Sequence, residues 1–417
     1  MMTNFFQAKS IAVIGASASP KKLGYQLLKN LIESGFKGTI LPINLKEKEI
    51  LAKTAYQSVL DVHRRIDLAV IIVPRENVPQ VLRQCVLKEI PYVVIISAGF
   101  AEKDAKGKKL QKELLAITKG SKTKIIGPNC LGIVDTANAL NLTFAATEVL
   151  KGPIGLILQS GAIGAAIFDW AKANEVGISK FISLGNKIHI TEIEALRILS
   201  GDPETKAIAL YLEEITDPRH FLAECRQLSK NKPIIILKGG MTIKGAQAAA
   251  SHTGALSSPE ELNTALFKQA NLIVAEDYEE LLNFLELFSA KTFDVEKNNL
   301  AIVTNAGGPG ILAVDAAADF KLNLPKLPTA QQDALSGDLS SSATLENPFD
   351  LGGDADAPSF QKTLDYLEKS NIYSAILTIV TPQATTDMVQ IAEILAKFRQ
   401  RPKIIIAIFL GGQKINK

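Results

Sequence analysis

The sequence is poor in the residue types that mark cross-linked, metal-binding and membrane-spanning proteins. Its 417 residues include 3 cysteines and 4 histidines, and the cysteines lie far apart with no CxxC pair. This spacing argues against a disulfide framework and a thiolate zinc site, and it fits a reducing compartment. The longest apolar runs, such as 68–73 and 92–96, have the length of a strand, whereas a membrane span needs ~20 residues. The N-terminus lacks the basic and apolar segments of a signal peptide, so we expect a soluble, cytoplasmic protein.

The charge is nearly balanced, with 46 basic and 43 acidic side chains and a net charge of +3. This balance gives no electrostatic case for binding nucleic acid or a membrane surface, although it is compatible with a local basic pocket for a phosphorylated ligand. Hydrophobic residues make up 47% of the chain, which excludes a largely disordered protein. At ~100–200 residues per domain, the length predicts two to four domains.

The first 147 residues alternate Val/Ile-rich runs with amphipathic stretches, a pattern typical of a parallel sheet covered by helices on both faces. The predicted fold class is therefore α/β. We expect strands at 10–17, 38–44, 67–74, 92–99 and 124–129, and helices at 23–35 and 77–89.

The remaining chain contains an internal repeat. Residues 153–171 resemble 299–317, each with a strand, a Gly-rich turn and a helix, and residues 206–240 resemble 374–412 in the order strand, helix, strand, Gly-Gly. We therefore expect three domains, namely 1–147, 148–292 and 293–417. The first copy continues for about fifty residues after its Gly-Gly pair and the second for five. We expect the last domain to be incomplete at its C-terminus.

A Gly-rich turn at Gly15 follows the first predicted strand and leads to a helix. Such a turn can hold a phosphate against the free amides of a helix N-terminus. The pattern is not GxGxxG, and no acidic residue ends the second strand to bind ribose hydroxyls. The first charged residue there is Lys46, which suits a ribose that carries a phosphate, as in coenzyme A or NADP. A turn that serves packing alone is the alternative for Gly15.

Three further loops follow the carboxyl ends of predicted strands, where open α/β sheets bind their ligands. They are 73–77, 97–102 and 127–132, and the last contains Cys130. No base accompanies Cys130 in the sequence. We therefore favour a packing or ligand-contact role for this residue over a catalytic thiol.

His252 is the candidate catalytic residue of the second domain. It lies in a segment of small residues, 244–262, in which backbone amides and the hydroxyls of Ser251 and Thr253 can approach a ligand on the imidazole. From this segment alone, a structural role for His252 is equally open. His63 and His220 lie in charged or helical contexts and are interpreted as surface residues.

Two other features favour a histidine that accepts a phosphoryl group. Residues 159–164 form a second strand–turn–helix pattern, in which Gly161 opens the helix, and Glu213 ends an apolar strand. A phosphoryl-accepting imidazole needs a carboxylate to orient its ring and oriented amides for the phosphoryl oxygens. Glu213 and the Gly161 turn can supply these roles if they lie close together in the fold.

Nine motifs, in chain order, carry a resemblance to a known family: IAVIGAS, ISAGFAE, GPNCLG, QSGAIGAAIFDWA, SLGN, ALYLEEI, ASHTGAL, NAGGPG and ENPFDLGG. With them the chain resembles the alpha subunit, or alpha-like half, of the NDP-forming (ADP-forming) acyl-CoA synthetases, which are related to succinyl-CoA synthetase. The motifs cover almost the whole chain, and ASHTGAL combined with GPNCLG is the most specific pair. The resemblance implies a Rossmann-like CoA-binding domain followed by two flavodoxin-like (succinyl-CoA synthetase-like) α/β domains with parallel sheets.

The resemblance also implies a reversible reaction. Phosphate converts an acyl-CoA to an acyl phosphate and free CoA, His252 takes the phosphoryl group with Glu213 as its partner, and ADP accepts it to give ATP and a free carboxylic acid. The implied CoA contacts are Gly15, Ser17, Lys46, Pro74, Ser97, Asn129 and Cys130. The implied phosphate or acyl-phosphate contacts are Ser160, Gly161, Asn186, Ser251, Thr253 and Gly254.

The resemblance implies partners as well. ADP/ATP and Mg²⁺ would bind an ATP-grasp (nucleotide-grasp) beta subunit or C-terminal half that this chain does not contain, so the chain is expected to form an oligomer and to need that partner for turnover. No metal site is expected in the chain itself. After SLGN the family commonly has acidic residues, where this sequence has His189 and Thr191, and residues 44–46 read NLK in place of NPK. These departures put the tuning of the acyl-phosphate loop, and the acid preferred, in doubt.

Two other functions compete with the synthetase. One is a CoA-binding regulatory or scaffold protein of the same fold, such as the synthetase-like half of a protein acetyltransferase, although such relatives often lose the histidine that is present here. The other is an NADP-dependent dehydrogenase, which the missing glycine fingerprint disfavours.

Overall fold

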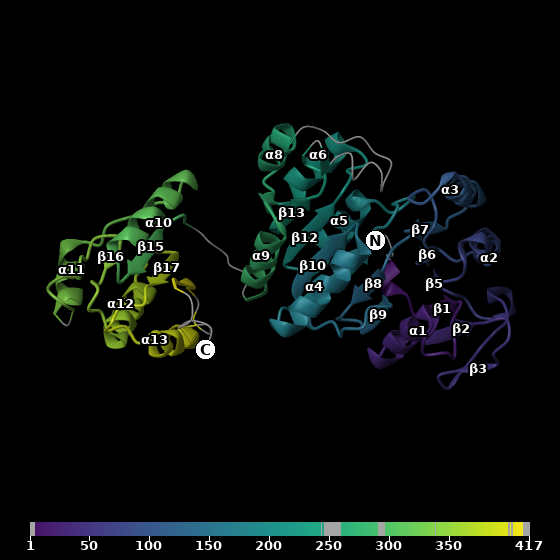
Figure 1. The fold of residues 1–417 in the computed structure, drawn as a ribbon, viewed down its shortest axis with the longest axis horizontal. Helices are drawn as coiled ribbons and strands as arrows, with labels where there is room; N and C mark the ends of the chain where they lie inside the picture. The colour runs from purple at the N-terminus through teal and green to yellow at the C-terminus, as the bar shows by residue number, and fades with distance from the viewer. Residues whose placement is uncertain are drawn as a thin grey trace. The chain divides into compact units, whose positions relative to one another are not determined.

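A computed structural model describes residues 5–242, 244–245, 260–290, 297–337, 339–398, 401 and 403–411 (Figure 1). The chain divides into two compact units, residues 1–292 and 293–417, which are described separately. Among the described helices, none is both long and apolar enough to cross a membrane.

The first unit begins with a five-stranded parallel sheet in the order β2-β1-β5-β6-β7. Its strands are β1 (Ser10–Ile14), β2 (Thr39–Ile43), β5 (Leu68–Ile71), β6 (Tyr92–Ile95) and β7 (Lys124–Ile126). All five predicted strands are confirmed, and each ends one to four residues earlier than expected because the chain leaves the sheet to form loops. The strand order reverses between β1 and β5, which is the position where doubly wound sheets bind ligands.

Helices cover both faces of this sheet, as the alternation predicted. They are α1 (Leu23–Glu33) on one face and α2 (Val78–Leu87) and α3 (Ala105–Thr118) on the other. Short elements complete the region: the 3₁₀ helices η1 (Phe5–Gln7), η2 (Val59–Asp61) and η3 (Arg75–Asn77), and a small hairpin of β3 (Glu49–Ile50) and β4 (Lys53–Thr54).

The second sheet of this unit has seven strands in the order β14-β13-β12-β10-β11-β8-β9. They are β8 (Gly132–Asp135), β9 (Leu140–Thr143), β10 (Lys151–Leu158), β11 (Ile178–Ser183), β12 (Ala207–Leu212), β13 (Ile234–Lys238) and β14 (Ile273–Val274). β10 to β14 run parallel, whereas β8 and β9 join antiparallel at one edge. The chain therefore enters the second sheet soon after β7, inside the segment assigned to the first predicted domain. The three-domain division stays a prediction.

Helices α4 (Gly161–Ala173) and α9 (Tyr278–Ala290) pack on one face of the second sheet, and α5 (Glu192–Ser200), α6 (Pro218–Leu228) and α8 (Glu260–Gln269) on the other. One hydrophobic core continues from the first sheet into the second, since Ile11 and Val13 belong to the same buried cluster as Ile157 and Ile182. The two sheets are thus parts of one packed body.

The second unit repeats the arrangement around β10 and β12. Its parallel sheet has the order β16-β15-β17-β18, with β15 (Leu300–Thr304), β16 (Phe349–Asp350), β17 (Ala375–Val380) and β18 (Ile404–Phe409). Its helices are α10 (Gly307–Asp319), α11 (Thr329–Ser336), α12 (Ala357–Lys369) and α13 (Met388–Lys397). The strand–helix pairs β10–α4 and β15–α10, and the units β12–α6–β13 and β17–α13–β18, match, which confirms the internal repeat.

Candidate functional site

A polar cleft in the first unit lies where loops from its two sheets meet. The first sheet contributes Glu102 and Asn129, which follow β6 and β7, and the second contributes residues that follow β10, β11 and β12. The polar groups that line the cleft include Glu102, Asn129, Gln159, Asn186, Glu213 and Glu214. These loops leave the carboxyl ends of parallel strands, the edge at which open α/β sheets bind ligands.

Glu213 is the second-sheet carboxylate predicted for this site, and it follows the last residue of β12. The Tyr211 hydroxyl donates to Glu213 Oε1 at 3.5 Å, and Lys238 Nζ donates to the Glu213 carbonyl at 2.7 Å. Burial and the nearby Glu213 charge raise the pKa of Tyr211 to about 12, so its hydroxyl stays a donor. Burial and Lys187 lower the pKa of Lys238, and Glu213 partly offsets this change.

The Gly-rich turn after β10 has the predicted form. Ser160 is the N-cap of α4 and its Oγ accepts from Ile163 N at 3.4 Å, and Gly161 is the first helical residue. A Cβ on Gly161 would lie 3.3 Å from Leu131 Cβ, so the turn approaches the loop after β7 closely. The amides at the start of α4 form the type of site that attracts anions.

The SLGN loop connects the two sheets. The Asn186 amide N–H donates to the Pro128 carbonyl at 2.9 Å, and its side-chain Nδ2 donates to Glu102 Oε2 at 2.6 Å and to Gln111 Oε1 at 2.8 Å. Asn129 Nδ2 lies 3.4 Å from Asn186 Oδ1. The predicted contacts Asn129 and Asn186, one from each side of the cleft, are therefore neighbours.

Two residues at this cleft adopt a backbone conformation that is uncommon for residues with a side chain. Asn129 and Lys187 have φ values of 60° and 53°, in the left-handed region that residues with a Cβ rarely adopt. Such positions cost on the order of 1–3 kcal/mol each and persist where the surroundings fix them, often at functional sites. The hydrogen bonds of Asn186 and Lys187 to neighbouring loops fix these two positions.

The Gly15 turn and the Lys46 loop lie together at the end of β1 and β2. Gly15 has φ 95°, and a Cβ there would lie 2.4 Å from the Ile72 carbonyl oxygen, so only glycine fits. Asn44 Nδ2 donates to the Ala16 carbonyl at 2.7 Å, and Asn44 Oδ1 accepts from Lys46 N at 2.8 Å. These bonds hold exposed Lys46 next to the turn that begins at Gly15.

Hydrogen bonds connect the loops that carry the remaining candidate residues of the first sheet. Ser97 Oγ donates to the Val73 carbonyl at 2.5 Å, one residue before Pro74, and Asn129 N donates to the Ser97 carbonyl at 3.0 Å. The predicted contacts after β5, β6 and β7 therefore form one continuous edge. Ser17 also belongs to this edge but is 7% exposed, and its Oγ accepts from Ser19 N.

Cys130 is buried at 4% exposure, and its Sγ lies 3.3 Å from the Ile95 carbonyl. Burial raises the pKa of this thiol to about 12, so it is protonated at neutral pH. A thiol in this state is a poor nucleophile. The geometry supports the packing role that the sequence analysis favoured over a catalytic thiol.

Four predicted residues, Ser251, His252, Thr253 and Gly254, lie outside the described residues. Within the described part, the sequence analysis missed Glu102, Gln111, Gln159 and Lys187 as residues of the site. Three of them lie inside or next to motifs that were recognised, because Glu102 ends ISAGFAE, Gln159 begins QSGAIG and Lys187 follows SLGN. Gln111 is on α3 and gave no local signal.

Comparison with known proteins assigns the family. Residues 9–136 match the family described as CoA binding domain, and residues 151–288 match the succinyl-CoA ligase like flavodoxin domain. The chain is 38% identical over 415 residues to the alpha subunit of acetate–CoA ligase (ADP-forming) I from Pyrococcus furiosus, covering 98% of this chain and 89% of that subunit. The chain belongs to the ADP-forming acyl-CoA synthetase family.

A solved structure and a longer relative extend the comparison. The dinucleotide-forming acetyl-coenzyme A synthetase 1 of Ca. Korarchaeum cryptofilum, solved with phosphate and ADP, matches with a TM-score of 0.91 at 31% identity over 98% of this chain and 88% of that one. Acetate–CoA ligase (ADP-forming) I of Archaeoglobus fulgidus is 37% identical over 416 residues, which are 100% of this synthetase-family chain but 59% of that ligase. The chain thus spans little more than half the length of such a relative.

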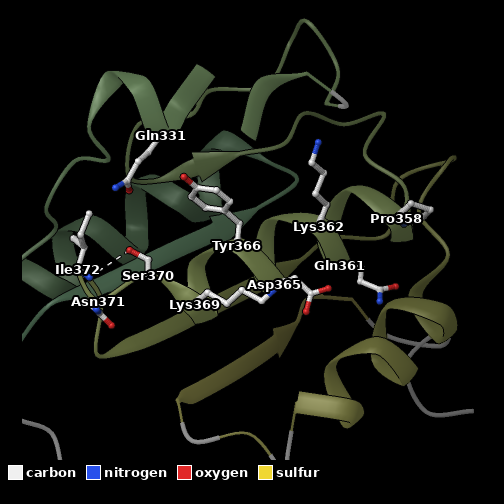
Figure 2. A pocket seen from close by; sticks show the side chains of 10 residues that line it. All are labelled: Gln331, Pro358, Gln361, Lys362, Asp365, Tyr366, Lys369, Ser370, Asn371 and Ile372. Carbon is white, nitrogen blue, oxygen red and sulfur yellow. Dashed lines mark hydrogen bonds between the residues drawn. The ribbon is translucent and has the colours of Figure 1, made fainter. Parts of the chain in front are cut away.

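The second unit of this family member contains a larger hollow, of about 860 Å³, between α11 and α12. Figure 2 shows its lining, in which Gln331 comes from α11 and Lys362 and Tyr366 from α12. The hollow continues past the C-terminal end of α12 to residues 370–372, where the chain is about to enter β17. The hollow therefore follows the whole length of α12, from Pro358 near its start to Lys369 at its end.

Proposed function

We propose that this chain is the alpha component of an ADP-forming acyl-CoA synthetase, which reversibly converts acyl-CoA, phosphate and ADP to a carboxylic acid, CoA and ATP. The observation that carries the proposal is the cleft that Glu213 and Gln159 share with Glu102 and Asn129 of the first-sheet loops, with the Gly161 turn packed close to Leu131 beside it. The family assignment agrees with this chemistry. We place the reaction in the cytoplasm, in an oligomer with an ATP-grasp subunit or half.

The first sheet would bind CoA along its carboxyl edge. The Gly15 turn approaches neighbouring backbone too closely for any side chain, which suits contact with a pyrophosphate, and Lys46 next to it suits a ribose phosphate. Pro74, Ser97 and Asn129 continue this edge toward the cleft. The thioester end of the coenzyme would then reach the carboxylates and amides between the sheets.

The residues at the cleft, together with His252, would carry out the two steps of the reaction. Phosphate attacks the thioester carbonyl, so that the C–S bond breaks and an acyl phosphate forms as CoA leaves. His252 then takes the phosphoryl group and the carboxylate leaves, while Glu213 orients the imidazole by accepting a hydrogen bond from its other ring nitrogen. The amides at the start of α4, with Ser160 and Asn186, would bind the phosphoryl oxygens. Ser251, Thr253 and Gly254 flank His252 and would add donors.

The phosphoryl group then passes to ADP. Mg²⁺ would accompany this nucleotide in the partner and neutralise phosphate charge there. The residues of this chain that hold CoA and orient the imidazole need no metal ion for those roles.

The test is phosphorylation of His252. Radiolabelled acetyl phosphate given to the chain, or γ-labelled ATP given together with the ATP-grasp partner, should place acid-labile, base-stable phosphate on the protein. His252→Ala should abolish the label and Glu213→Gln should slow it, whereas His220→Ala, a change at an exposed histidine, should leave it unchanged. Equal labelling of His252→Ala would refute the proposal, and CoA binding without any label would favour a regulatory protein instead.

A further inference from the structure

The turn that follows β12, residues 213–216, is held by side chains from elsewhere in the fold. Gln159 Oε1 accepts from two consecutive amides of this turn, Glu213 N at 2.9 Å and Glu214 N at 3.0 Å. Gln159 is 8% exposed, so water competes little for these bonds. One carboxamide oxygen thus fixes the backbone on which the Glu213 side chain is mounted.

A buried ion pair holds the other side of the same turn. Lys187 Nζ lies 3.0 Å from Glu192 Oε2, and the two side chains are 3% and 0% exposed. Lys187 Nζ also donates to the Glu214 carbonyl at 2.7 Å, and Glu192 Oε1 accepts from Thr216 N at 2.6 Å. Both ions of the pair therefore direct hydrogen bonds to the backbone of the turn.

Burying and pairing a lysine does not by itself bring it into contact with this turn, as a second buried lysine, Lys180 on β11, shows. Lys180 Nζ lies 3.0 Å from Asp135 Oδ2 and 3.1 Å from Asp202 Oδ1, with Lys180 and Asp135 side chains 6% and 0% exposed. Asp202 accepts from Thr205, which precedes β12, whereas Glu213 follows it. Lys180 is thus a matched buried cation that does not bond to the Glu213 turn.

We propose that Gln159, Lys187 and Glu192 are positioning residues that fix the turn carrying Glu213 for phosphoryl transfer. The inference rests on the proposed function, because it gives Glu213 a partner imidazole. None of the three needs to touch the transferred group. Their role is to limit the movement of the turn, so that the carboxylate meets the imidazole ring at a constant distance and angle.

The first experiment removes the Gln159 acceptor. Gln159→Leu keeps most of the side-chain volume but cannot accept a hydrogen bond, whereas Gln159→Glu keeps an acceptor and adds a negative charge. Hydrogen–deuterium exchange of a peptide covering residues 213–216 should accelerate in Gln159→Leu and stay near the wild-type rate in Gln159→Glu. This readout does not depend on activity.

The second readout is single-turnover transfer from radiolabelled acyl phosphate to the protein. Gln159→Leu should slow transfer by about ten- to a hundredfold with the affinity for CoA within about twofold. Gln159→Glu should recover most of the rate, because it restores an acceptor for the two amides of the turn. A residue that only stabilises the fold would leave the transfer rate per folded molecule unchanged in both variants.

The ion pair is tested with both charges removed together. The double variant Lys187→Met/Glu192→Gln leaves neither ion unpaired and should show faster exchange over residues 213–216 and slower transfer. Lys180→Met is the control and should lower thermal stability with an unchanged transfer rate per folded molecule.

The outcomes separate the inference from the proposed function. Faster exchange with an unchanged transfer rate, or unchanged exchange in both Gln159→Leu and the double variant, would overturn the positioning role while His252 labelling stands. If wild-type protein takes no label at all, the proposed function fails, and with it the catalytic purpose of the turn. Equal losses in Lys180→Met would show a general stability effect and would also overturn the inference.

Discussion

Thr191 and His189 stand after the SLGN loop at positions where the resemblance leads one to expect acidic residues, and both make local contacts in the structure. Thr191 is the N-cap of α5: its Oγ1 accepts from Ile193 N, and Glu194 reaches back to the Thr191 amide at 2.9 Å. An acidic residue could fill the same position, since Asp is an equally good cap. Thr191 therefore belongs to the helix start rather than to the cleft lining.

His189 predicts a pH dependence of stability. Its Nδ1 lies 3.3 Å from Ile125 N and accepts that N–H, which requires an unprotonated nitrogen. Burial and the nearby Lys124 charge lower the pKa of His189 below 6.5. The unfolded chain therefore binds a proton more readily, so this contribution is complete above pH ~6.5 and is lost as the pH falls toward the folded-state pKa.

Urea unfolding at pH 7.5 and pH 5.5 tests whether protonation of His189 lowers the stability of the folded protein. Wild-type protein should lose more free energy of unfolding between these pH values than His189→Asn, which keeps an acceptor but does not titrate. The same loss in both proteins would contradict the prediction.

At this scale the sequence pointed to residues that lie along the cleft more readily than to the residues that hold them in place. Glu213 and Gly161 could be named because one ends a strand and the other opens a turn, and the resemblance added Ser160, Asn129 and Asn186. Gln159 and Lys187 were not, because their partners are backbone groups 54 to 55 and 27 residues away in the chain. A hydrogen bond to distant backbone leaves no local pattern.

Glycine is the second residue of both α1 and α10, but only in α1 does it lie against another part of the chain. In α1, a Cβ on Gly24 would lie 2.0 Å from the Gly15 carbonyl oxygen, so the missing side chain lets the helix pack against the turn. In α10, a Cβ on Gly308 meets no atom within 4 Å. The two positions form a matched pair for testing close helix–turn packing.

Gly24→Ala should destabilise the first unit by about 1–3 kcal/mol, the usual effect of overpacking. Gly308→Ala should be neutral or should stabilise the second unit by up to ~1 kcal/mol, because alanine is the better helix former. Differential scanning calorimetry of both variants measures these changes. Equal effects of the two substitutions would show that contact with Gly15 is unimportant.

Elements were predictable where buried Val/Ile-rich strands alternate with amphipathic helices, as at β1 and β5 of the first sheet. β8 and β9 show where this reasoning stops. They are four residues each: β8 pairs antiparallel with β11, about forty-five residues further along the chain, and β9 pairs antiparallel with β8. No helix lies between these two strands, so the alternating pattern did not reveal them, and the predicted first domain, 1–147, simply included their residues.

At the scale of the whole molecule, the packing predicts two unfolding transitions. Both sheets of the first unit share one buried cluster, and η1 connects them: the Phe5 ring packs against Tyr92 of β6, and Lys180 of β11 lies 5.4 Å from the Phe6 ring centre. The second unit has a separate core that includes Phe349 and Phe360. Residues that share a core unfold together, whereas separate cores need not.

The single tryptophan, Trp170 on α4, allows unfolding of the first unit to be followed separately. Tryptophan fluorescence should report one transition for both sheets of the first unit, and circular dichroism should add a second transition from the second unit. Three transitions, or one transition common to both probes, would contradict the prediction. The repeat in the sequence predicts three domains, but a repeat shows where units are copied and not which of them unfold together.

Asn186 and Lys187 are consecutive residues, yet they bond to opposite sides of the cleft. Asn186 contacts Glu102 in the loop after β6 of the first sheet, and Lys187 contacts the Glu214 carbonyl in the turn after β12 of the second sheet. A ligand that changes the position of one loop must therefore act on the other through two adjacent peptide units. Free-energy coupling of this kind is reciprocal. If bound CoA alters the equilibrium for phosphorylating the protein by some factor, phosphorylation alters the dissociation constant of CoA by the same factor.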